Sequence, residues 1–444
     1  MGEHTHITRS CKRKGERAVN VKALKGFKDI LPDETPVWRR IEAVAREVFA
    51  RFGFEEIRVP VVEKTELFVR SIGEATDIVE KEMYTFADRN GVSVTLRPEG
   101  TAPVLRAFAE HGLHVRKPVQ RLYTIGPMFR YERPQKGRLR QFHQLSAEVL
   151  GGAAPFLDAE VMAAAWSILE ELGVDVSLEI NSLGCAACRP AFRQELVAFL
   201  QQRLAALCPD CQRRTATNPL RVLDCKNEAC RRQLAGAPSI LDALCSGCRS
   251  HFHVVRQGLE LLHIPYRENP FMVRGLDYYC RTTFELVTDA LGAQSAVGAG
   301  GRYDGLLARL GGPDLPGIGF GMGLERLTLL CGGQEASGRD CDLFVAALGE
   351  RARSFAFALV HRLRRSGLRA LMDTEGRGLK SQMKQAARAS AAWTLIVGDN
   401  EMEGGEAVLR DMRHGEQAAL PLAFDDPLAA AAAVVQRLGV AAEA

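Results

Sequence analysis

The stretch Gly126–Gly152, GPMFRYERPQKGRLRQFHQLSAEVLGG, decides how the chain is interpreted. Its residues up to Arg130 predict a strand, a polar loop containing Gly137 follows, and a second strand begins near Phe142. Two strands joined by one polar loop predict an antiparallel hairpin. The loop carries five charged side chains, which are Glu132, Arg133, Lys136, Arg138 and Arg140.

The second strand of this hairpin places polar chemistry on one of its faces. Because side chains alternate along a strand, one face is polar and aromatic while the other is aliphatic. The first face carries Phe142, Gln144, Ser146 and Glu148, and the second carries Leu145, Ala147 and Val149. An arginine binds phosphate bidentately, an aromatic ring stacks on a base, and a carboxylate accepts from a substrate N–H. The hairpin therefore indicates a binding surface, and the alternative is the solvated face of an ordinary antiparallel sheet.

Length and charge indicate the number of domains and the class of protein to which the hairpin belongs. A chain of 444 residues is too long for one hydrophobic core and predicts two or three domains. The net charge of +4 implies no partner by itself, so any basic patch must be local. No apolar run reaches about 18 residues, so we expect no membrane span. Residues 1–20 are basic without an apolar core, which predicts a disordered extension on a cytoplasmic protein and no secretory signal.

Two further strands precede the hairpin. FEEIRVPVVEK (54–64) predicts a strand that ends at Pro60, and proline there favours an edge or interface position. VSVTLRPEGT (92–101) predicts a half-buried strand whose valines and Leu96 face the core, and its end carries Arg97, Glu99 and Thr101. Polar groups where a strand hands over to a helix favour a site, although RPEGT could equally be a capping turn.

The rest of the chain divides into three parts. A helix capped by Asp158 and a strand follow the hairpin, and residues 184–269 then change to a helical segment that we interpret as an insertion. Strands resume in MVRGLDYYCRTTFELVTD (272–289), and glycine-rich turns follow. Alternating strands and helices at 340–444 predict a small α/β domain. One face of its second helix carries only positive charges, from Arg377, Lys380, Lys384 and Arg388. This pattern favours a face that binds a nucleic-acid phosphate backbone over an ordinary solvent-exposed face.

The cysteines cluster in the insertion. Eight of the twelve lie within it, namely Cys185, Cys188, Cys208, Cys211, Cys225, Cys230, Cys245 and Cys248. Cys-x₂-Cys pairs at this spacing suit one or two tetrahedral zinc sites, and free thiols in a helical segment are the alternative. We expect any such Zn²⁺ to be structural.

These motifs resemble class II aminoacyl-tRNA synthetases. RVPVVE with Pro60, the hairpin, and GFGMGLERL with Arg326 resemble motifs one, two and three of that class. TLRPEGT, VRGLDYYCRTTFE and GAGGRYDGL narrow the resemblance to the histidyl-tRNA synthetase family, from about Val21 to the C-terminus. The cysteines are not part of that family pattern.

The resemblance implies an α+β fold. It implies a mostly antiparallel catalytic sheet flanked by helices at residues 21–335, with the helical insertion at about 184–269. An anticodon-binding α/β domain follows at 340–444. It also implies a homodimer that forms through motif one.

The resemblance also implies a two-step reaction: ATP-dependent formation of histidyl-adenylate, then transfer to the 3′-terminal adenosine of tRNA(His). Both reactants of the first step are anionic, so the site must neutralise charge and align them rather than supply a nucleophile. Arg130 and Arg274 are then the catalytic arginines at the α-phosphate. Phe142 and Arg326 would sandwich the adenine, Glu132 would belong to the same ATP site, and Mg²⁺ would accompany the pyrophosphate.

The remaining assignments concern histidine and tRNA. By resemblance Glu99, Thr101 and Gln144 receive the α-ammonium group, while Glu148 and Tyr279, next to Tyr278, hydrogen-bond the imidazole. Arg133 and Gln135 of the loop would reach the tRNA acceptor end. Two alternatives stay open: a non-enzymatic regulatory paralogue of histidine biosynthesis, and a class II synthetase for another amino acid. The presence of the phosphate arginines and of a C-terminal domain speaks against the first, and the Glu148–Tyr279 pair against the second.

Overall fold

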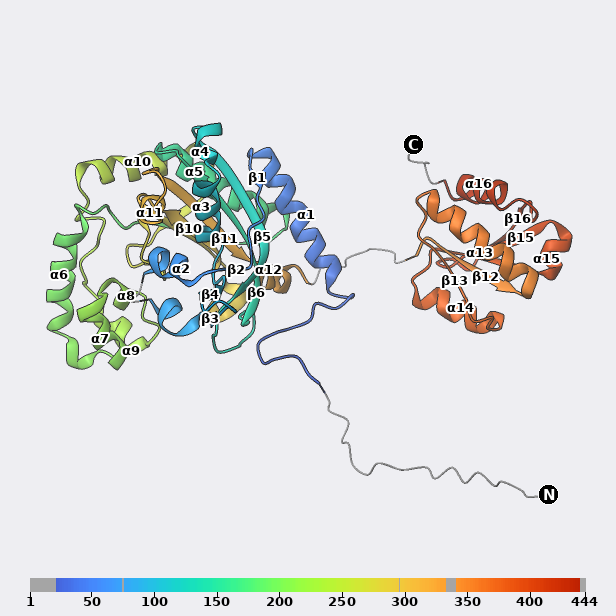
Figure 1. Cartoon of the computed structure of the whole chain (residues 1–444), viewed down its shortest axis with the longest axis horizontal. Helices are drawn as coiled ribbons and strands as arrows, with labels where there is room; N and C mark the ends of the chain where they lie inside the picture. The colour runs from blue at the N-terminus through green and yellow to red at the C-terminus, as the bar shows by residue number, and fades with distance from the viewer. Residues whose placement is uncertain (1–20, 74–75, 295, 333–340, 440–444) are drawn as a thin grey trace, which may run out of the picture. The chain divides into compact units, whose positions relative to one another are not determined.

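The computed structural model describes residues 21–73, 76–294, 296–332 and 341–439. The chain separates into two compact units, residues 1–335 and 336–444, and each is described by itself (Figure 1). The predicted basic extension at 1–20 lies outside the described residues. Among the helices that are described, none combines the length and the apolar character needed to cross a bilayer.

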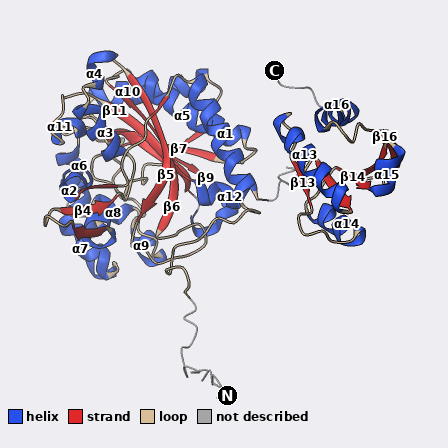
Figure 2. Ribbon diagram, turned by 45° about the vertical axis from the view of Figure 1, so that its right-hand side comes forward, coloured by secondary structure: helices blue, strands red, loops and turns tan. Residues whose placement is uncertain are grey.

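The N-terminal unit is built on an eight-stranded sheet. Its strands run in the order β1 (Glu55–Glu56), β5 (Gln120–Phe129), β6 (Gln141–Leu150), β11 (Gly317–Gly323), β10 (Ala296–Arg302), β9 (Cys280–Val287), β7 (Ser177–Ser182) and β8 (Tyr266–Glu268). Only the outermost pairs, β1–β5 and β7–β8, are parallel. The mixed, mostly antiparallel sheet that was predicted is confirmed, and Figure 2 shows helices around it.

The hairpin predicted from the sequence is β5–β6, and only one of its two faces packs into the hydrophobic core. Leu145, Ala147 and Val149 enter the main core, where they pack with Ile41 and Phe49 of a covering helix. The helices that contribute to this core are α1 (Thr35–Arg51), α5 (Pro155–Glu171), α10 (Ser246–Leu261) and α12 (Leu324–Cys331). The polar face of β6 is thereby left for a site.

Three local predictions were wrong. The strand expected to end at Pro60 is split into β1 and β2 (Val62–Lys64), because the chain there leaves the large sheet for a small one. In the next strand Val92 is exposed and Thr95 is buried, since the Thr95 hydroxyl bonds with the hydroxyls of Thr65 and Thr85, both at 2.9 Å. Asp158 does not cap α5. It lies fully buried in an ion pair with Arg302.

A small sheet and the helices around it lie beside the start of α3 (Thr101–Glu110). The sheet is antiparallel, in the order β2, β4 (Ser93–Leu96) and β3 (Tyr84–Ala87). Its neighbours are α2 (Thr65–Ile72), the π-helical turn Ile78–Glu82, α3 (Thr101–Glu110) and α4 (Leu113–Arg116). Two short elements elsewhere in the unit are the 3₁₀ segment Asp289–Gln294 and α11 (Leu306–Arg309).

The segment between β7 and β8 is helical. It contains α6 (Arg189–Gln201), the 3₁₀ turn Leu204–Ala206, α7 (Pro209–Thr217), α8 (Leu220–Leu223), α9 (Glu228–Gln233) and α10. Strand β8 already belongs to the large sheet, so the helical part ends at Leu261, earlier than the 184–269 range of the sequence analysis. We call residues 184–261 the insertion.

The C-terminal unit is a five-stranded sheet with its own hydrophobic core. The strand order is β13 (Ala370–Met372), β12 (Leu343–Leu348), β14 (Trp393–Gly398), β15 (Glu406–Asp411) and β16 (Gln417–Pro421). Its helices are α13 (Glu350–Arg365), α14 (Leu379–Arg388), α15 (Asp399–Gly404) and α16 (Pro427–Leu438). Arg377 precedes α14 and pairs with Asp373 at 2.8 Å, so it is not part of the predicted helical stripe.

Candidate active site

A cavity of about 310 Å³ lies over the polar face of β6. Its wall is drawn from the ends of β5 and β6, the start of α3, the loop before β9, strands β10 and β11, and the first turn of α12. The following residues proposed from the sequence line it: Glu99, Thr101, Arg130, Glu132, Phe142, Gln144, Arg274, Tyr278, Tyr279 and Arg326. Segments far apart in the chain therefore meet at one cavity.

Arg130 leaves β5 at the cavity wall and is held in place by the backbone. Its Nε donates to the carbonyl of Pro98 at 2.8 Å, and its guanidinium carbon lies 5.3 Å from the centre of the Phe142 ring. Burial lowers the pKa of Arg130, against the opposing effect of Glu82 and Glu99. A fixed cation beside an aromatic face suits a nucleotide phosphate next to its base.

Arg274 and Arg326 reach the cavity from other elements. Arg274 forms an ion pair with Glu285 of β9 and lies 5.8 Å from the centre of the Tyr279 ring. Burial lowers the pKa of Arg274, but Glu285 together with Tyr279 and Tyr278 raises it overall. Arg326, from α12, donates to the carbonyl of Ala296 and, at 3.3 Å, to that of Gly137.

The arginines of this cavity repel one another. Burial lowers the pKa of Arg326, and the charges of Arg138 and Arg130 lower it further. Burial likewise lowers the pKa of Arg138, a cavity residue to which the sequence analysis gave no role. Since four arginines converge on one cavity, namely Arg130, Arg138, Arg274 and Arg326, the cavity is suited to a polyanion.

Glycine makes room for polar side chains in β11. A Cβ on Gly319 would lie 1.8 Å from Oε2 of Glu148, and one on Gly321 would lie 1.8 Å from Nε2 of Gln144. A Cβ on Gly319 would also lie 2.5 Å from the carbonyl oxygen of Ala147, so the approach of the two strands requires glycine there, whereas at Gly321 the flexible end of Gln144 would have to move. The glycine-rich GFGMG sequence is therefore needed for the shape of the site.

Glu148 lies behind the cavity wall. The Thr101 hydroxyl donates to its Oε1 at 2.7 Å, and the Tyr303 hydroxyl donates to its Oε2. The carboxyl group is almost completely buried, and burial raises its pKa to about 8. Sequence reasoning missed Tyr303 although it quoted the motif GAGGRYDGL, because only the fold shows that this ring meets Glu148.

Glu99 fixes the beginning of α3. Its two carboxylate oxygens accept from the backbone N–H groups of Thr101, at 2.7 Å, and Ala102, at 2.8 Å. Burial raises the pKa of Glu99, and these N–H bonds oppose the rise. The capping interpretation of RPEGT is confirmed by these bonds, and Glu99 also lines the cavity, so the site interpretation stays a prediction.

The two tyrosines of VRGLDYY are buried beside each other. The centres of the Tyr278 and Tyr279 rings lie 4.7 Å apart, and burial raises the pKa of both hydroxyls. Both therefore stay protonated near neutral pH and can donate a hydrogen bond to a ligand.

The loop between β5 and β6 closes the cavity. Glu132 is buried in an ion pair with Arg138, and Gln135 and Arg138 exchange backbone hydrogen bonds of 3.0 and 2.9 Å. Arg133 and Gln135 are exposed and do not line this cavity.

A second cavity of about 280 Å³ adjoins the first. The two share Arg130, Glu132 and Arg138 in their linings. The opposite wall of the second cavity comes from the insertion, with Arg214 and Arg221 among its residues. We call it the outer cavity.

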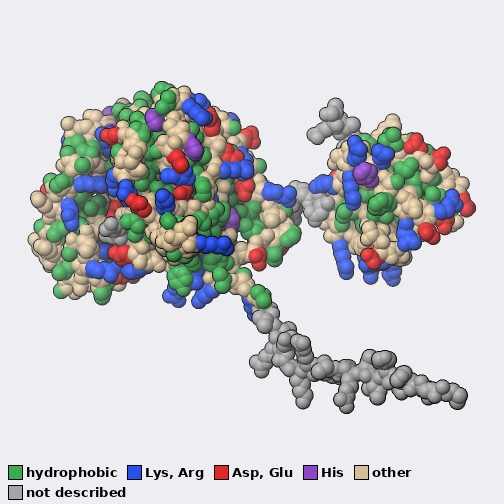
Figure 3. Space-filling model, viewed as in Figure 1, with side chains coloured by type: hydrophobic (Ala, Val, Ile, Leu, Met, Phe, Trp, Pro, Cys, Tyr) green, Lys and Arg blue, Asp and Glu red, His purple; other side chains and the backbone are tan. Residues whose placement is uncertain are grey.

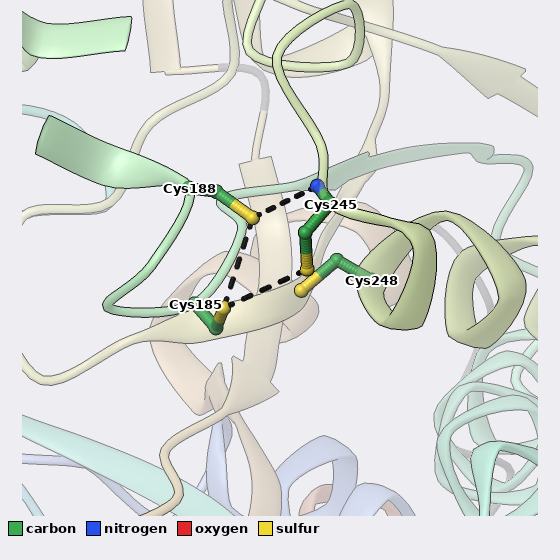
Figure 4. Close-up of side chains that lie close together, drawn as sticks. All are labelled: Cys185, Cys188, Cys245 and Cys248. Atoms are coloured by element: carbon green, nitrogen blue, oxygen red, sulfur yellow. Dashed lines mark hydrogen bonds between the residues drawn. The ribbon is translucent and has the colours of Figure 1, made fainter. Parts of the chain in front are cut away.

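The eight insertion cysteines form two groups that could hold a metal ion. The first, the root group, is Cys185, Cys188, Cys245 and Cys248 (Figure 4), and the second, the lobe group, is Cys208, Cys211, Cys225 and Cys230. Within each group all four sulfur atoms lie within 4.8 Å of one another.

Comparison with known proteins identifies relatives along almost the whole chain. Residues 26–327 match the histidyl-tRNA synthetase family, and residues 342–424 match an anticodon-binding domain. A histidine–tRNA ligase of Desulfotalea psychrophila is 57% identical over 425 residues, which is 95% of this chain and 98% of that protein. One of Syntrophotalea carbinolica is 57% identical over 91% of this chain and 97% of its own length.

A solved structure agrees with these relatives. The apo histidyl-tRNA synthetase of S. aureus superposes with a TM-score of 0.76 at 37% identity, and the match covers 90% of this chain and 97% of that one.

Proposed function

The chain belongs to the histidyl-tRNA synthetase family and is a histidine–tRNA ligase, and from this premise we propose how its residues share the reaction. The enzyme activates histidine with ATP and Mg²⁺, releases pyrophosphate, and transfers the histidyl group to tRNA. The cavity over β6, where four arginines converge beside Phe142, carries the proposal.

Arg130 and Arg274 are the catalytic residues at the α-phosphate. Both line the cavity, and the charge of Arg274 lowers the pKa of Arg130, so their positive fields overlap where the phosphate would lie. The histidine carboxylate attacks phosphorus and pyrophosphate leaves, which requires alignment and charge neutralisation at preorganised donors. Mg²⁺ enters with ATP, bound chiefly by phosphate oxygens and water, and supplies further neutralisation of the leaving group.

Phe142 and Arg326 hold the adenine between them. Both line the cavity, and Arg326 is anchored by its bonds to Ala296 and Gly137. Ring stacking on one side and a guanidinium on the other suit any flat heterocycle. Glu132 supports this ATP site by holding Arg138 in its ion pair.

Histidine binds at the opposite end, near α3. Glu99, Thr101 and Gln144 receive the α-ammonium group, and Tyr279, next to Tyr278, bonds one imidazole nitrogen.

The second imidazole nitrogen of histidine donates to Glu148 in place of the Thr101 hydroxyl. The Tyr303 hydroxyl keeps its hydrogen bond to the other oxygen of Glu148. An apolar side chain would leave these buried groups unpaired, which gives the site strong selectivity for histidine.

The tRNA contacts lie at both units. Arg133 and Gln135 are exposed on the loop between β5 and β6 and contact the acceptor end. In the C-terminal unit, Lys380, Lys384 and Arg388 are exposed on α14. Figure 3 shows basic side chains gathered along the lower edge of this unit. One-sign charge on one helix suits the phosphates of the anticodon arm.

We further propose a cytoplasmic homodimer whose insertion cysteines hold structural Zn²⁺. Strand β1 is the edge of the large sheet, which leaves its backbone open to a second copy near Pro60. Sedimentation of the purified protein tests the dimer. The cytoplasm is where tRNA is charged for translation.

ATP–pyrophosphate exchange with single amino acids tests the site as a whole. Exchange that depends on histidine alone supports the assignment. Exchange with another amino acid, or none, contradicts the histidine pocket or the activation residues, respectively.

A further inference from the structure

The sulfur atoms of the two cysteine groups are spaced as ligands of a single ion. In the root group Sγ of Cys185 lies 3.7 Å from that of Cys188 and 3.9 Å from that of Cys245, and in the lobe group Cys208 and Cys225 are 4.0 Å apart. A tetrahedral ion with zinc–sulfur bonds of about 2.3 Å has sulfur–sulfur edges about 1.63 times longer, or about 3.8 Å. The observed separations agree with this edge and are far longer than a disulfide bond.

Backbone N–H groups point at these sulfurs. The N–H of Cys245 donates to Sγ of Cys188 at 3.2 Å, as Figure 4 shows, and that of Cys208 donates to Sγ of Cys230 at 3.1 Å. A thiolate is a much better acceptor than a thiol, and metal-bound sulfur is normally supported by such outer bonds. The backbone is therefore arranged for thiolates.

The lobe around the second group buries few aliphatic side chains of its own. Helix α7 buries only Cys211 and Thr215, and α9 buries only Cys230. Between residues 207 and 234, the buried aliphatic side chains are Leu207, Val222, Leu223 and Leu234. These four pack in the same core cluster as Phe192 and Leu196 of α6, so a metal ion would reinforce a lobe that already packs against its neighbours.

We propose that the insertion binds two Zn²⁺ ions, one in the root group and one in the lobe group, each through four thiolates. A mononuclear site fits the spacing better than a cubane iron–sulfur cluster, because the cluster places one thiolate on each of four irons and spreads the sulfurs apart. Closed four-thiolate sites are structural, since no ligand position stays open for substrate.

The root ion is tied to the histidine end of the cavity. Arg189, which follows Cys188, donates to the carbonyl of Leu183 at 3.2 Å and to that of Tyr279. The N–H of Leu183 bonds to the carbonyl of Arg281 at 2.7 Å, and the N–H of Arg281 to that of Gly184 at 2.8 Å. These bonds link the root group to the segment that carries Tyr279, so the root ion positions that residue.

The lobe ion supports the wall of the outer cavity. Cys208 and Cys211 lie at the start of α7, which carries Arg214, and Arg214 reaches Asp77 at 3.2 Å. Just beyond α7, Asn218 donates to Asp277 at 3.1 Å. The expected consequences for histidine and tRNA rest on the proposed function, whereas the presence of the ions does not.

Metal analysis of the full-length protein tests the proposal. The protein is produced with zinc in the medium, purified without chelator, and compared with Cys245→Ser, Cys208→Ser and the control Cys280→Ser. Cys245 and Cys208 are the exposed and half-buried members of their groups, and Cys280 is a half-buried cysteine outside both. We expect about two equivalents of zinc in the wild type and the control, and about one in each of the other variants.

The outcomes decide the matter separately for each site. Less than about 0.2 equivalents of zinc in folded wild-type protein overturns the proposal, as does iron with visible absorption in its place. Two equivalents that survive Cys245→Ser overturn the root site, and two that survive Cys208→Ser overturn the lobe site. If a variant does not fold, wild-type protein reconstituted with Co²⁺ serves instead. Thiolate charge-transfer absorption that saturates at about two equivalents supports the proposal, and saturation at one or none contradicts it.

A functional readout separates this proposal from that of the active site. Loss of the root ion should raise the KM for histidine in pyrophosphate exchange, whereas loss of the lobe ion should lower tRNA charging and spare exchange. A protein that holds two zinc ions but shows no histidine-dependent exchange would contradict the active-site proposal alone.

Discussion

The hydroxyl of Thr101 donates a 2.7 Å hydrogen bond to Oε1 of Glu148. This bond joins the first residue of α3 to the buried part of β6, across 47 positions of sequence. The Tyr303 hydroxyl holds the other oxygen, so one carboxyl group connects three motifs. The histidine end of the cavity is therefore a built network whose members act together.

Arg274→Ala should lower ATP–pyrophosphate exchange by about two to three orders of magnitude, the usual effect of removing a preorganised transition-state donor. The substitution also leaves Glu285 without its partner, so folding is checked by thermal unfolding. Arg267→Ala, on exposed β8, also removes an arginine–glutamate pair and should retain activity. Near wild-type exchange in Arg274→Ala would remove this arginine from the catalytic step.

The pH dependence of stability should reveal Glu148. Burial raises its pKa from 4.5 to about 8, so the folded state holds a proton that the unfolded state has lost between these values. This contribution to stability is complete below pH 4.5 and is lost as pH rises to about 8, with a slope of up to about 1.4 kcal/mol per pH unit.

Glu148→Gln should remove that slope. The glutamine amide does not titrate, so the unfolding free energy of the variant should fall less between pH 5 and 8 than that of the wild type, as measured by denaturant titration. Identical profiles would mean that the Glu148 carboxyl is ionised throughout. The same variant should raise the KM for histidine, because the glutamine amide offers one acceptor oxygen to two donors, the Tyr303 hydroxyl and the imidazole.

Gly321→Ala should damage the site by crowding. Its new Cβ would lie 1.8 Å from Nε2 of Gln144, so Gln144 must leave its position. Because only the flexible side chain of Gln144 has to move, we expect little loss of stability and a higher KM for histidine. Gly323→Ala on the same strand meets nothing within 4 Å and should melt like the wild type. An unchanged KM for histidine in Gly321→Ala would exclude the proposed steric role.

Charge reversal on α14 should affect tRNA and not amino-acid activation. Lys380→Glu combined with Lys384→Glu should lower tRNA charging by about tenfold or more at physiological salt, because phosphate contacts dominate such affinity. Pyrophosphate exchange, which takes place in the other unit, should be unchanged. Arg437→Glu combined with Arg362→Glu, at exposed positions of α16 and α13, is the charge-matched control. Equal losses in the control would indicate a general effect of net charge.

Much of this molecule could be predicted because its motifs are local. The alternation in β6 is sufficient to separate Phe142 and Gln144 from Leu145, and the glycines of β11 stand in one short run. The general class of the fold follows from such patterns, since strand and helix periods are properties of neighbouring residues. The local errors arose where a polar face was buried, as at Thr95, or where a carboxylate found a distant partner, as at Asp158.

What the sequence determined by itself is the hairpin, its residue types and the cysteine spacing. Only the tertiary structure decided which side chains contact one another. Glu148 lies behind the cavity wall with Tyr303, and the eight cysteines sort into two groups that pair Cys185 with Cys245 and Cys208 with Cys225. The reason is physical: such contacts depend on how strands and helices that are far apart in the chain pack together. The spacing of residues along the chain does not specify the distance between them in space.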